Sequence, residues 1–265
     1  QHFIRPVVIL KQAGKGVVGF HADLPFKPLA CFWHETLFDE IKHRIPVTAE
    51  LAVVSIGIAL LLAIPLGVTA GYRQGSRVDQ SISAMAQFLL SIPSFIVGLI
   101  LIYFLSIRLR WLPATGWTRL TESVTGNIKS VIMPAISLAL TEIAVYTRIV
   151  RSDMINTLKE TYVLSAKSKG LKDRFILFRH ALRPSSLTLT TIVGLNIAGL
   201  IGGTVVIEQL FALPGLGKRL LDAIFQRDFI MVQGVTVFMA CVYVVINTLV
   251  DIFYMIIDPR IRRKS

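Results

Sequence analysis

The chain has 265 residues, of which 54% are hydrophobic, and its mean hydropathy is +0.66. It is therefore too apolar for an ordinary soluble domain, and several membrane-spanning helices are expected. The net charge of +12 would suggest nucleic acid as the partner of a soluble protein. Here the basic residues lie between apolar runs, as in the cytoplasmic loops of membrane proteins, and we expect no binding of nucleic acid.

Residues 1–47 are mixed in composition and contain four prolines. A glycine pattern from Gly14 to Gly19 fits a dinucleotide-binding loop, but prolines follow within ten residues and no βαβ unit continues. A glycine-rich loop is the better interpretation. The histidines and acidic residues of this segment fit no ligand spacing, so we predict no metal site.

Five apolar stretches are long enough to cross a membrane as helices, which rise 1.5 Å per residue. Two of them contain residues that disturb a helix: Pro65 near the end of the first, and the run Ser91-Ile-Pro-Ser94 inside the second. The expected spans are Leu51–Ala70, Ser81–Ile107, Val131–Val150, Leu187–Ile207 and Gln233–Ile257.

Lysine and arginine are unequally divided between the two sides of these spans, with 15 on one side and seven on the other. Because the basic side of a membrane protein is cytoplasmic, we place the 151–184 loop and the 258–265 tail inside. The N-terminal segment 1–47 and the 208–232 loop of the membrane domain 48–257 are then outside. An odd number of spans with an external residue 1 leads us to expect a further span before this chain.

The basic loop at 160–184 is predicted to form two short helices. Helical spacing begins at Tyr162, and Gly170 is expected to end this first helix through a positive φ. Asp173 is the predicted N-cap of a second helix, Arg174–Leu182, which stops before a proline.

This loop, with the sequence ETYVLSAKSKGLKDRFILFRHALRP, resembles the cytoplasmic EAA loop by which ABC-importer permeases dock on the ATP-hydrolysing subunit. It is most similar to the B-type permeases of the dipeptide, oligopeptide and nickel group. The resemblance extends from about Glu40 to Arg263, although Leu213 replaces the usual Trp and Pro184 a frequent Asn. Further signatures of the family are Ser91-Ile-Pro-Ser-Phe95, Trp111-Leu-Pro-Ala-Thr-Gly116, Phe211-Ala-Leu-Pro-Gly-Leu-Gly217 and Asp258-Pro-Arg-Ile-Arg262.

The resemblance implies an all-α polytopic protein of the bacterial cytoplasmic (inner) membrane with the type I ABC-importer permease fold. It implies a permease subunit that forms the translocation path for peptides or similar small solutes, with nickel or another metal complex as the alternative cargo. The implied partners are a second permease subunit of the C-type, two ATPase subunits, an external solute-binding protein and membrane lipid. A membrane-embedded enzyme is the alternative from another class, but no H-E-x-x-H or Asp-rich motif is present.

The run Gly215-Leu-Gly-Lys218 resembles the end of a phosphate-binding loop. Ala212 occupies the position of the first glycine, however, and Arg219 replaces the Ser or Thr. We therefore expect no catalytic residue and no cofactor in this chain, with ATP and Mg²⁺ bound by the partner ATPase subunits.

Three groups of residues are candidates for function. The first group forms the predicted coupling helix at the ATPase: Ala166, Lys167, Ser168, Lys169, Gly170 and Leu171. The second group allows close helix packing, either within the subunit or at the permease dimer interface: Ala198, Gly199, Gly202 and Gly203. The third group is polar within the membrane and either lines the path or forms interhelical hydrogen bonds: Gln87, Ser91 and Asn196, with Glu142, Asn247 and Asp251 also intramembrane.

Overall fold

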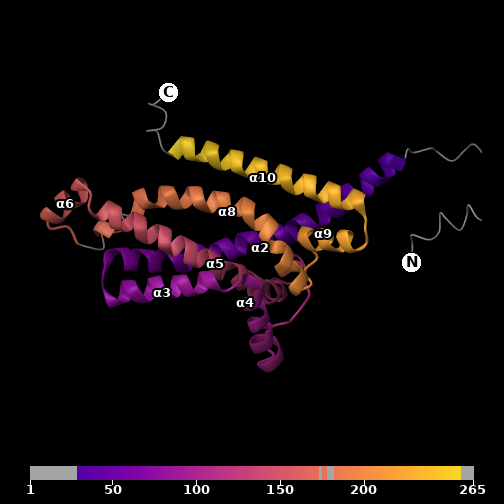
Figure 1. The fold of residues 1–265 in the computed structure, drawn as a ribbon, viewed down its shortest axis with the longest axis horizontal. Helices are drawn as coiled ribbons and strands as arrows, with labels where there is room; N and C mark the ends of the chain where they lie inside the picture. The colour runs from indigo at the N-terminus through magenta and orange to yellow at the C-terminus, as the bar shows by residue number, and fades with distance from the viewer. Residues whose placement is uncertain (1–28, 173–174, 178–181, 258–265) are drawn as a thin grey trace, which may run out of the picture. The chain divides into compact units, whose positions relative to one another are not determined.

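The computed structural model describes residues 29–172, 175–177 and 182–257, and all regular structure in these residues is helical (Figure 1). The chain divides into two compact units, Gln1–Phe38 and Asp39–Ser265, and the second contains the membrane domain. The helices are α2 (Leu29–Tyr72), α3 (Arg77–Ser91), α4 (Ser94–Leu101), the π-helix η1 (Ile102–Arg108), α5 (Val124–Leu158), α6 (Thr161–Ser168), α8 (Leu182–Leu210), α9 (Leu216–Phe225) and α10 (Phe229–Ile257).

Each predicted span falls within these helices, and most of the helices are longer than expected. In the described residues, three are long and apolar enough to cross a membrane, at Leu37–Tyr72, Val124–Leu158 and Phe229–Val250, and there are four when the bent pair formed by α3 with α4 and η1 is counted as one span. Of the predicted span 187–207, the described apolar stretch is the shorter Thr188–Ile197. The first helix begins at Leu29 rather than Leu51. Buried side chains at Ile41 and Val47 lie in this N-terminal extension of the helix.

The predicted break in the second span is confirmed. The segment bends by 92° between α3 and α4. Ile92 is extended, with φ −101° and ψ 119°, which is the conformation that a following proline favours. Pro93 then caps α4, where its missing N–H costs no helical hydrogen bond.

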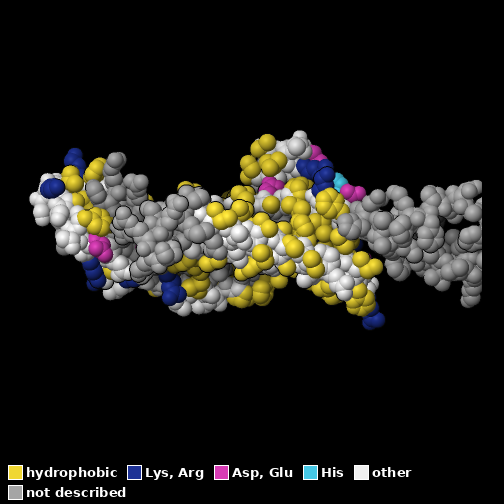
Figure 2. Space-filling model, turned by 90° about the horizontal axis from the view of Figure 1, so that it is seen from above, with side chains coloured by type: hydrophobic (Ala, Val, Ile, Leu, Met, Phe, Trp, Pro, Cys, Tyr) yellow, Lys and Arg dark blue, Asp and Glu magenta, His cyan; other side chains and the backbone are white. Residues whose placement is uncertain are grey.

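On the face seen in Figure 2, hydrophobic side chains cover much of the described surface, and Lys and Arg lie in small groups. Large apolar side chains point outward from several helices, including Val53, Leu61, Phe88 and Val237, which are 62–75% exposed. An outer surface of this kind is stable in hydrocarbon and unstable in water.

Close contact between α2 and α5 forms one centre of the fold. A Cβ added at Gly67 would lie 2.6 Å from Val150 Cβ, and one added at Gly71 would lie 2.7 Å from Met154 Cβ. The two glycines have the G-x-x-x-G spacing that lets helix backbones approach each other. Next to them, Ala59 and Ala63 pack in one buried cluster with Tyr146 and other α5 side chains.

A buried carboxylate joins α2, α8 and α9. Glu208, which is fully buried, accepts hydrogen bonds from Thr48 Oγ1 (2.7 Å) and from the backbone N–H of Lys218 (2.9 Å). The N–H of Leu216 in turn donates to Thr48 Oγ1 (3.0 Å). The glycine-rich start of α9 thus donates a backbone amide to a carboxylate, which is a side chain of the same chain.

The contact at Gly67 predicts different effects for two similar substitutions in α2. Gly67→Leu forces side-chain atoms against Val150 and the carbonyl oxygen of Thr147, whereas an added Cβ at Gly57 meets no atom within 4 Å. We expect Gly67→Leu to destabilise the fold by about 1–3 kcal/mol or more and Gly57→Leu to leave it unchanged. Thermal unfolding of the two detergent-purified variants measures this, and equal melting temperatures would contradict the assigned contact.

Removal of the Glu208 carboxylate should loosen helix α9. Glu208→Ala leaves the buried donors on Thr48 and Lys218 unpaired, which costs about 1–3 kcal/mol for each group. We expect faster amide hydrogen exchange across α9 in this variant, while Glu122→Ala, at an exposed carboxylate, leaves exchange unchanged. Unaltered exchange in α9 of Glu208→Ala would show that other contacts hold this helix.

Candidate functional site

The predicted coupling segment follows α5 directly, as helix α6. Val163 and Ala166 of α6 are buried in a small apolar cluster with Ile176, and Leu158 at the end of α5 packs against it. Tyr162, on another face of α6, is 46% exposed. The cluster fixes α6 to the end of α5. The side chain of Ala166, one of the predicted coupling residues, therefore points into this cluster and not toward a partner.

The C-terminus of α6 is closed by a glycine, as predicted. Gly170 has φ +74°, and the N–H of Leu171 donates to the carbonyl oxygen of Ala166 (3.4 Å), which is the pattern of a Schellman motif. An added Cβ at Gly170 meets no atom within 4 Å, so backbone conformation is the requirement for glycine within this chain. Ser168, Lys169, Gly170 and Leu171 are exposed and form the outer tip of this region.

Two parts of the predicted loop lie outside the described residues. These are the side chain of Lys167 and Asp173, the proposed N-cap of the second helix. Of the helix predicted at 174–182, residues 175–177 and Leu182 are described; all are helical, and Leu182 begins α8.

An ion pair that the sequence reasoning missed lies behind this segment. Asp79, in the first turn of α3, is 2% exposed and accepts two hydrogen bonds from Arg151 of α5, one of them from Nη2 to Oδ2 at 2.8 Å. The N–H of Gly75 also donates to Asp79 (2.9 Å). A bidentate pair of this kind is strong and directional. It fixes the 73–76 turn and α3 to the last two turns of α5, from which α6 follows. From the sequence, Arg151 was expected only to be one of the basic residues on the cytoplasmic side.

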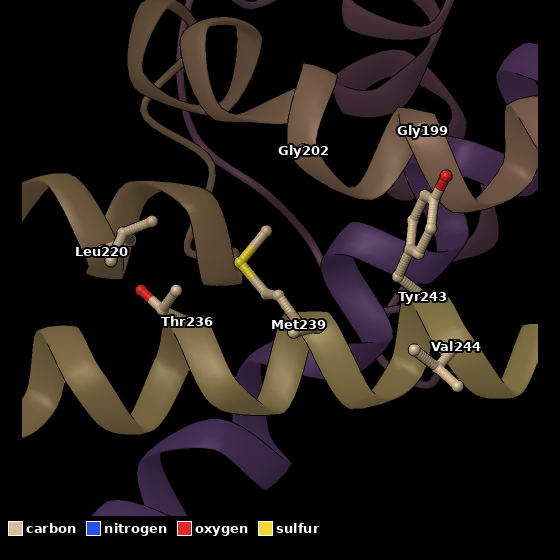
Figure 3. Close-up of a pocket in the computed structure, with 8 residues that line it drawn as sticks. Gly199, Gly202, Leu220, Thr236, Met239, Tyr243 and Val244 are labelled. Atoms are coloured by element: carbon tan, nitrogen blue, oxygen red, sulfur yellow. The ribbon is translucent and has the colours of Figure 1, made fainter.

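The small residues of α8 face an open hollow. Gly199 and Gly202 are exposed, and an added Cβ at either position meets no atom within 4 Å. Together with residues of α9 and α10 they line an apolar cavity of about 520 Å³, toward which Met239 and Tyr243 extend from α10 (Figure 3). Of the two predicted uses, packing within the subunit is therefore not seen for these two glycines. The side chains at Ala198 and Gly203 lie outside the described part.

Of the predicted intramembrane polar residues, the structure brings Asn196 and Glu142 together and places Gln87 and Ser91 elsewhere. Asn196 Nδ2 of α8 donates to Glu142 Oε2 of α5 (2.7 Å), so it does form an interhelical hydrogen bond. Both side chains also line a second cavity, of about 220 Å³, together with Ser94, Thr141 and Gly199. Gln87 and Ser91 are exposed at the end of α3 and do not line this cavity. Asn247 is partly buried in α10, and Asp251 has no described side chain.

Comparisons with known proteins agree with this architecture. Residues 63–263 match the family described as "Binding-protein-dependent transport system inner membrane component". An oligopeptide transport system permease protein, AppB of Bacillus subtilis, is 43% identical over 223 residues, which cover 83% of this chain and 71% of that protein. A putative peptide transport system permease protein of Brucella abortus is 40% identical over 222 residues, which cover 84% and 71% of the two chains.

The fold is similar to that of solved ABC importers. An inward-facing structure of the MetNI methionine ABC transporter aligns with a TM-score of 0.69 at 14% identity, covering 84% of this chain and 99% of that one. An amino acid ABC transporter aligns with a TM-score of 0.61 at 13% identity, covering 90% and 99%. The predicted all-α type I permease fold is thereby confirmed. This chain belongs to the binding-protein-dependent transport system inner-membrane components and is a membrane-embedded permease subunit of an ABC importer.

Proposed function

We propose that this subunit carries peptides across the bacterial inner membrane after an external solute-binding protein has delivered them. One observation carries the proposal: the chain is similar to relatives named for peptide and oligopeptide transport. The identity is 40–43% over more than four-fifths of the chain. Two ATPase subunits supply the energy and bind ATP and Mg²⁺, and this chain itself holds no cofactor.

The coupling element of this proposal is the exposed tip at Ser168–Leu171, presented by α6. Its buried residues Val163 and Ala166 fix α6 to α5, and the Asp79–Arg151 pair fixes α5 to α3. A displacement of the tip by the ATPase subunits is therefore transmitted to α5 and α3 as a movement of packed helices rather than absorbed locally. Of the predicted coupling residues 166–171, Ala166 therefore supports α6 from within the apolar cluster, and the exposed residues 168–171 form the contact surface.

The second permease subunit, a C-type paralogue, occupies the open face of α8. Gly199 and Gly202 there let another helix approach closely. The apolar hollow lined by Leu220, Met239 and Tyr243 would receive its side chains. The solute path then lies between the two subunits, beside this face.

The proposed orientation can be tested with single cysteines. In a variant without Cys31 and Cys241, we expect Lys169→Cys to be protected from an impermeant thiol reagent in intact cells and labelled after permeabilisation. Phe225→Cys, at a position 77% exposed in α9 of the external loop, should be labelled in intact cells. The reasons are the 15-to-7 division of Lys and Arg and the position of the coupling tip. Periplasmic labelling at position 169 would reverse the assigned topology.

The coupling role can be tested with a matched pair of glycines. Gly170 and Gly75 both have positive φ (74° and 79°), both have free space around an added Cβ, and both lie on the predicted cytoplasmic side. Substitution by Phe strains each backbone by about 1 kcal/mol or more. Only Gly170→Phe also places an aromatic ring on the coupling tip. We expect Gly170→Phe to abolish ATP hydrolysis stimulated by the loaded binding protein, and Gly75→Phe to retain most of it.

The measurement is the ATPase activity of the reconstituted complex, after both variants are shown to insert and to assemble with the ATPase subunits. Normal stimulation in an assembled Gly170→Phe complex would exclude this tip as the coupling element. Loss of assembly in Gly170→Phe alone would place the tip at the subunit contact itself, as proposed.

A further inference from the structure

A carboxylate lies in the middle of the membrane domain without a basic partner. Glu142 is near the midpoint of α5, and Asn196, to which it is hydrogen bonded, is near the midpoint of α8. Among the described residues, the ion pairs all involve other acidic residues, namely Glu40, Asp79 and Asp228. An acidic group at this depth is costly to place and is usually found where it faces a water-filled path or a partner.

The donors around Glu142 satisfy only part of its capacity. Asn196 Nδ2 donates to Glu142 Oε2 (2.7 Å), and the same amide also donates to the Tyr146 hydroxyl (3.4 Å). Asn196 is a neutral donor, whereas a carboxylate has about four acceptor sites. The two fully or almost fully buried carboxylates of the described residues are satisfied differently: Asp79 has Arg151, and Glu208 has several backbone and hydroxyl donors. Glu142 is partly buried and retains an open side.

That open side borders the 220 Å³ cavity. The cavity is lined by Ser94, where the broken helix resumes as α4, and by Thr141 and Asn196, all of which carry polar groups. Gly199 also lines it, and the same glycine lines the larger hollow on the open face of α8. The cavity therefore adjoins the face assigned above to the second permease subunit, where the solute would pass. Binding sites of transporters are typically found at such interrupted helices near the centre of the membrane.

We propose that Glu142, positioned by Asn196, binds the protonated N-terminal amino group of a peptide during its passage. The inference rests on the proposed function and adds a contact that selects for a cationic amine. A single carboxylate beside neutral hydroxyl and amide groups suits an ammonium group, which takes a few short charge-assisted hydrogen bonds. A bound metal ion is less well supported, because no group of three His, Cys, Asp or Glu side chains occurs in the part of the chain that the structure describes. Unmodified peptides all carry this ammonium group, so the contact would serve peptides of varied sequence.

The test uses the assembled complex and two peptides, alanyl-alanine and N-acetyl-alanyl-alanine. Glu142→Gln removes the charge but keeps an oxygen that accepts from Asn196, and Glu142→Asp keeps the charge. Saturation-transfer NMR on the detergent-purified complex, without binding protein, measures peptide contact with the membrane subunits directly. We expect Glu142→Gln to weaken binding of alanyl-alanine about tenfold, Glu142→Asp to retain most of it, and neither variant to change the signal of the acetylated peptide. Glu122→Gln, at an exposed carboxylate of the external region, is the matched control and should behave as wild type.

A second measurement is the uptake of labelled alanyl-alanine into proteoliposomes with binding protein and ATP. It distinguishes a failure of the Glu142 site from a failure of the proposed peptide transport. Slower uptake in Glu142→Gln, with unchanged thermal stability, supports the site. Wild-type affinity and uptake in Glu142→Gln would overturn it while leaving peptide transport intact, and Glu142 would then only hold α5 to α8. An equal loss for free and acetylated peptide would likewise assign a structural role. If the wild-type complex accumulates no peptide, the proposed function fails, and the peptide site fails with it.

Discussion

The direct contact of α2 with α5 is the constraint on which the other parts of the membrane domain depend. At Gly67 and Gly71 no side chain separates the two helices, so α5 is held at a fixed distance and rotation. Such packing matters in a membrane because lipid removes the hydrophobic drive between helices and leaves van der Waals contact and hydrogen bonds to hold them together. With α5 fixed, its middle presents Glu142 and its end presents α6.

Three carboxylates show how the chain treats charge away from water. Asp79 has a cationic partner, and Glu208 is surrounded by amide and hydroxyl donors, so both are neutralised or satisfied within the chain. An unpaired donor or acceptor in a low-dielectric interior is costly, which explains why these two groups fix helix ends so firmly. Glu142 has only neutral partners and an adjoining cavity. The difference in partners, rather than depth or burial alone, separates structural carboxylates from a candidate ligand contact.

Much of this arrangement follows from local sequence rules. The break at Pro93 and the positive φ of Gly170 are properties of one or two residues, and both were predicted correctly. Pairings between distant segments were not accessible in this way. An added Cβ at Gly67 or Gly71 meets α5, yet one at Gly199, which begins a run with the same spacing, meets no atom within 4 Å. Likewise, nothing local indicates that Arg151 meets Asp79 or that the backbone amides of α9 meet Glu208, because these contacts depend on which helices are adjacent.

The distribution of close contacts indicates where the subunit can move. Helix α9 is tied to α2 and α8 through Glu208, and the tip at Ser168–Leu171 is tied through α6, α5 and Asp79 to α3. Neither α9 nor the tip can shift relative to the helices that hold it without leaving buried polar groups unpaired. Each is therefore expected to move as a rigid part together with those helices. The open face of α8 has no such ties at Gly199 and Gly202, and the helix is interrupted between α3 and α4 next to the Glu142 cavity. Conformational change is therefore expected to concentrate at the centre of the membrane, where a solute would be bound and released, while the two ends transmit it.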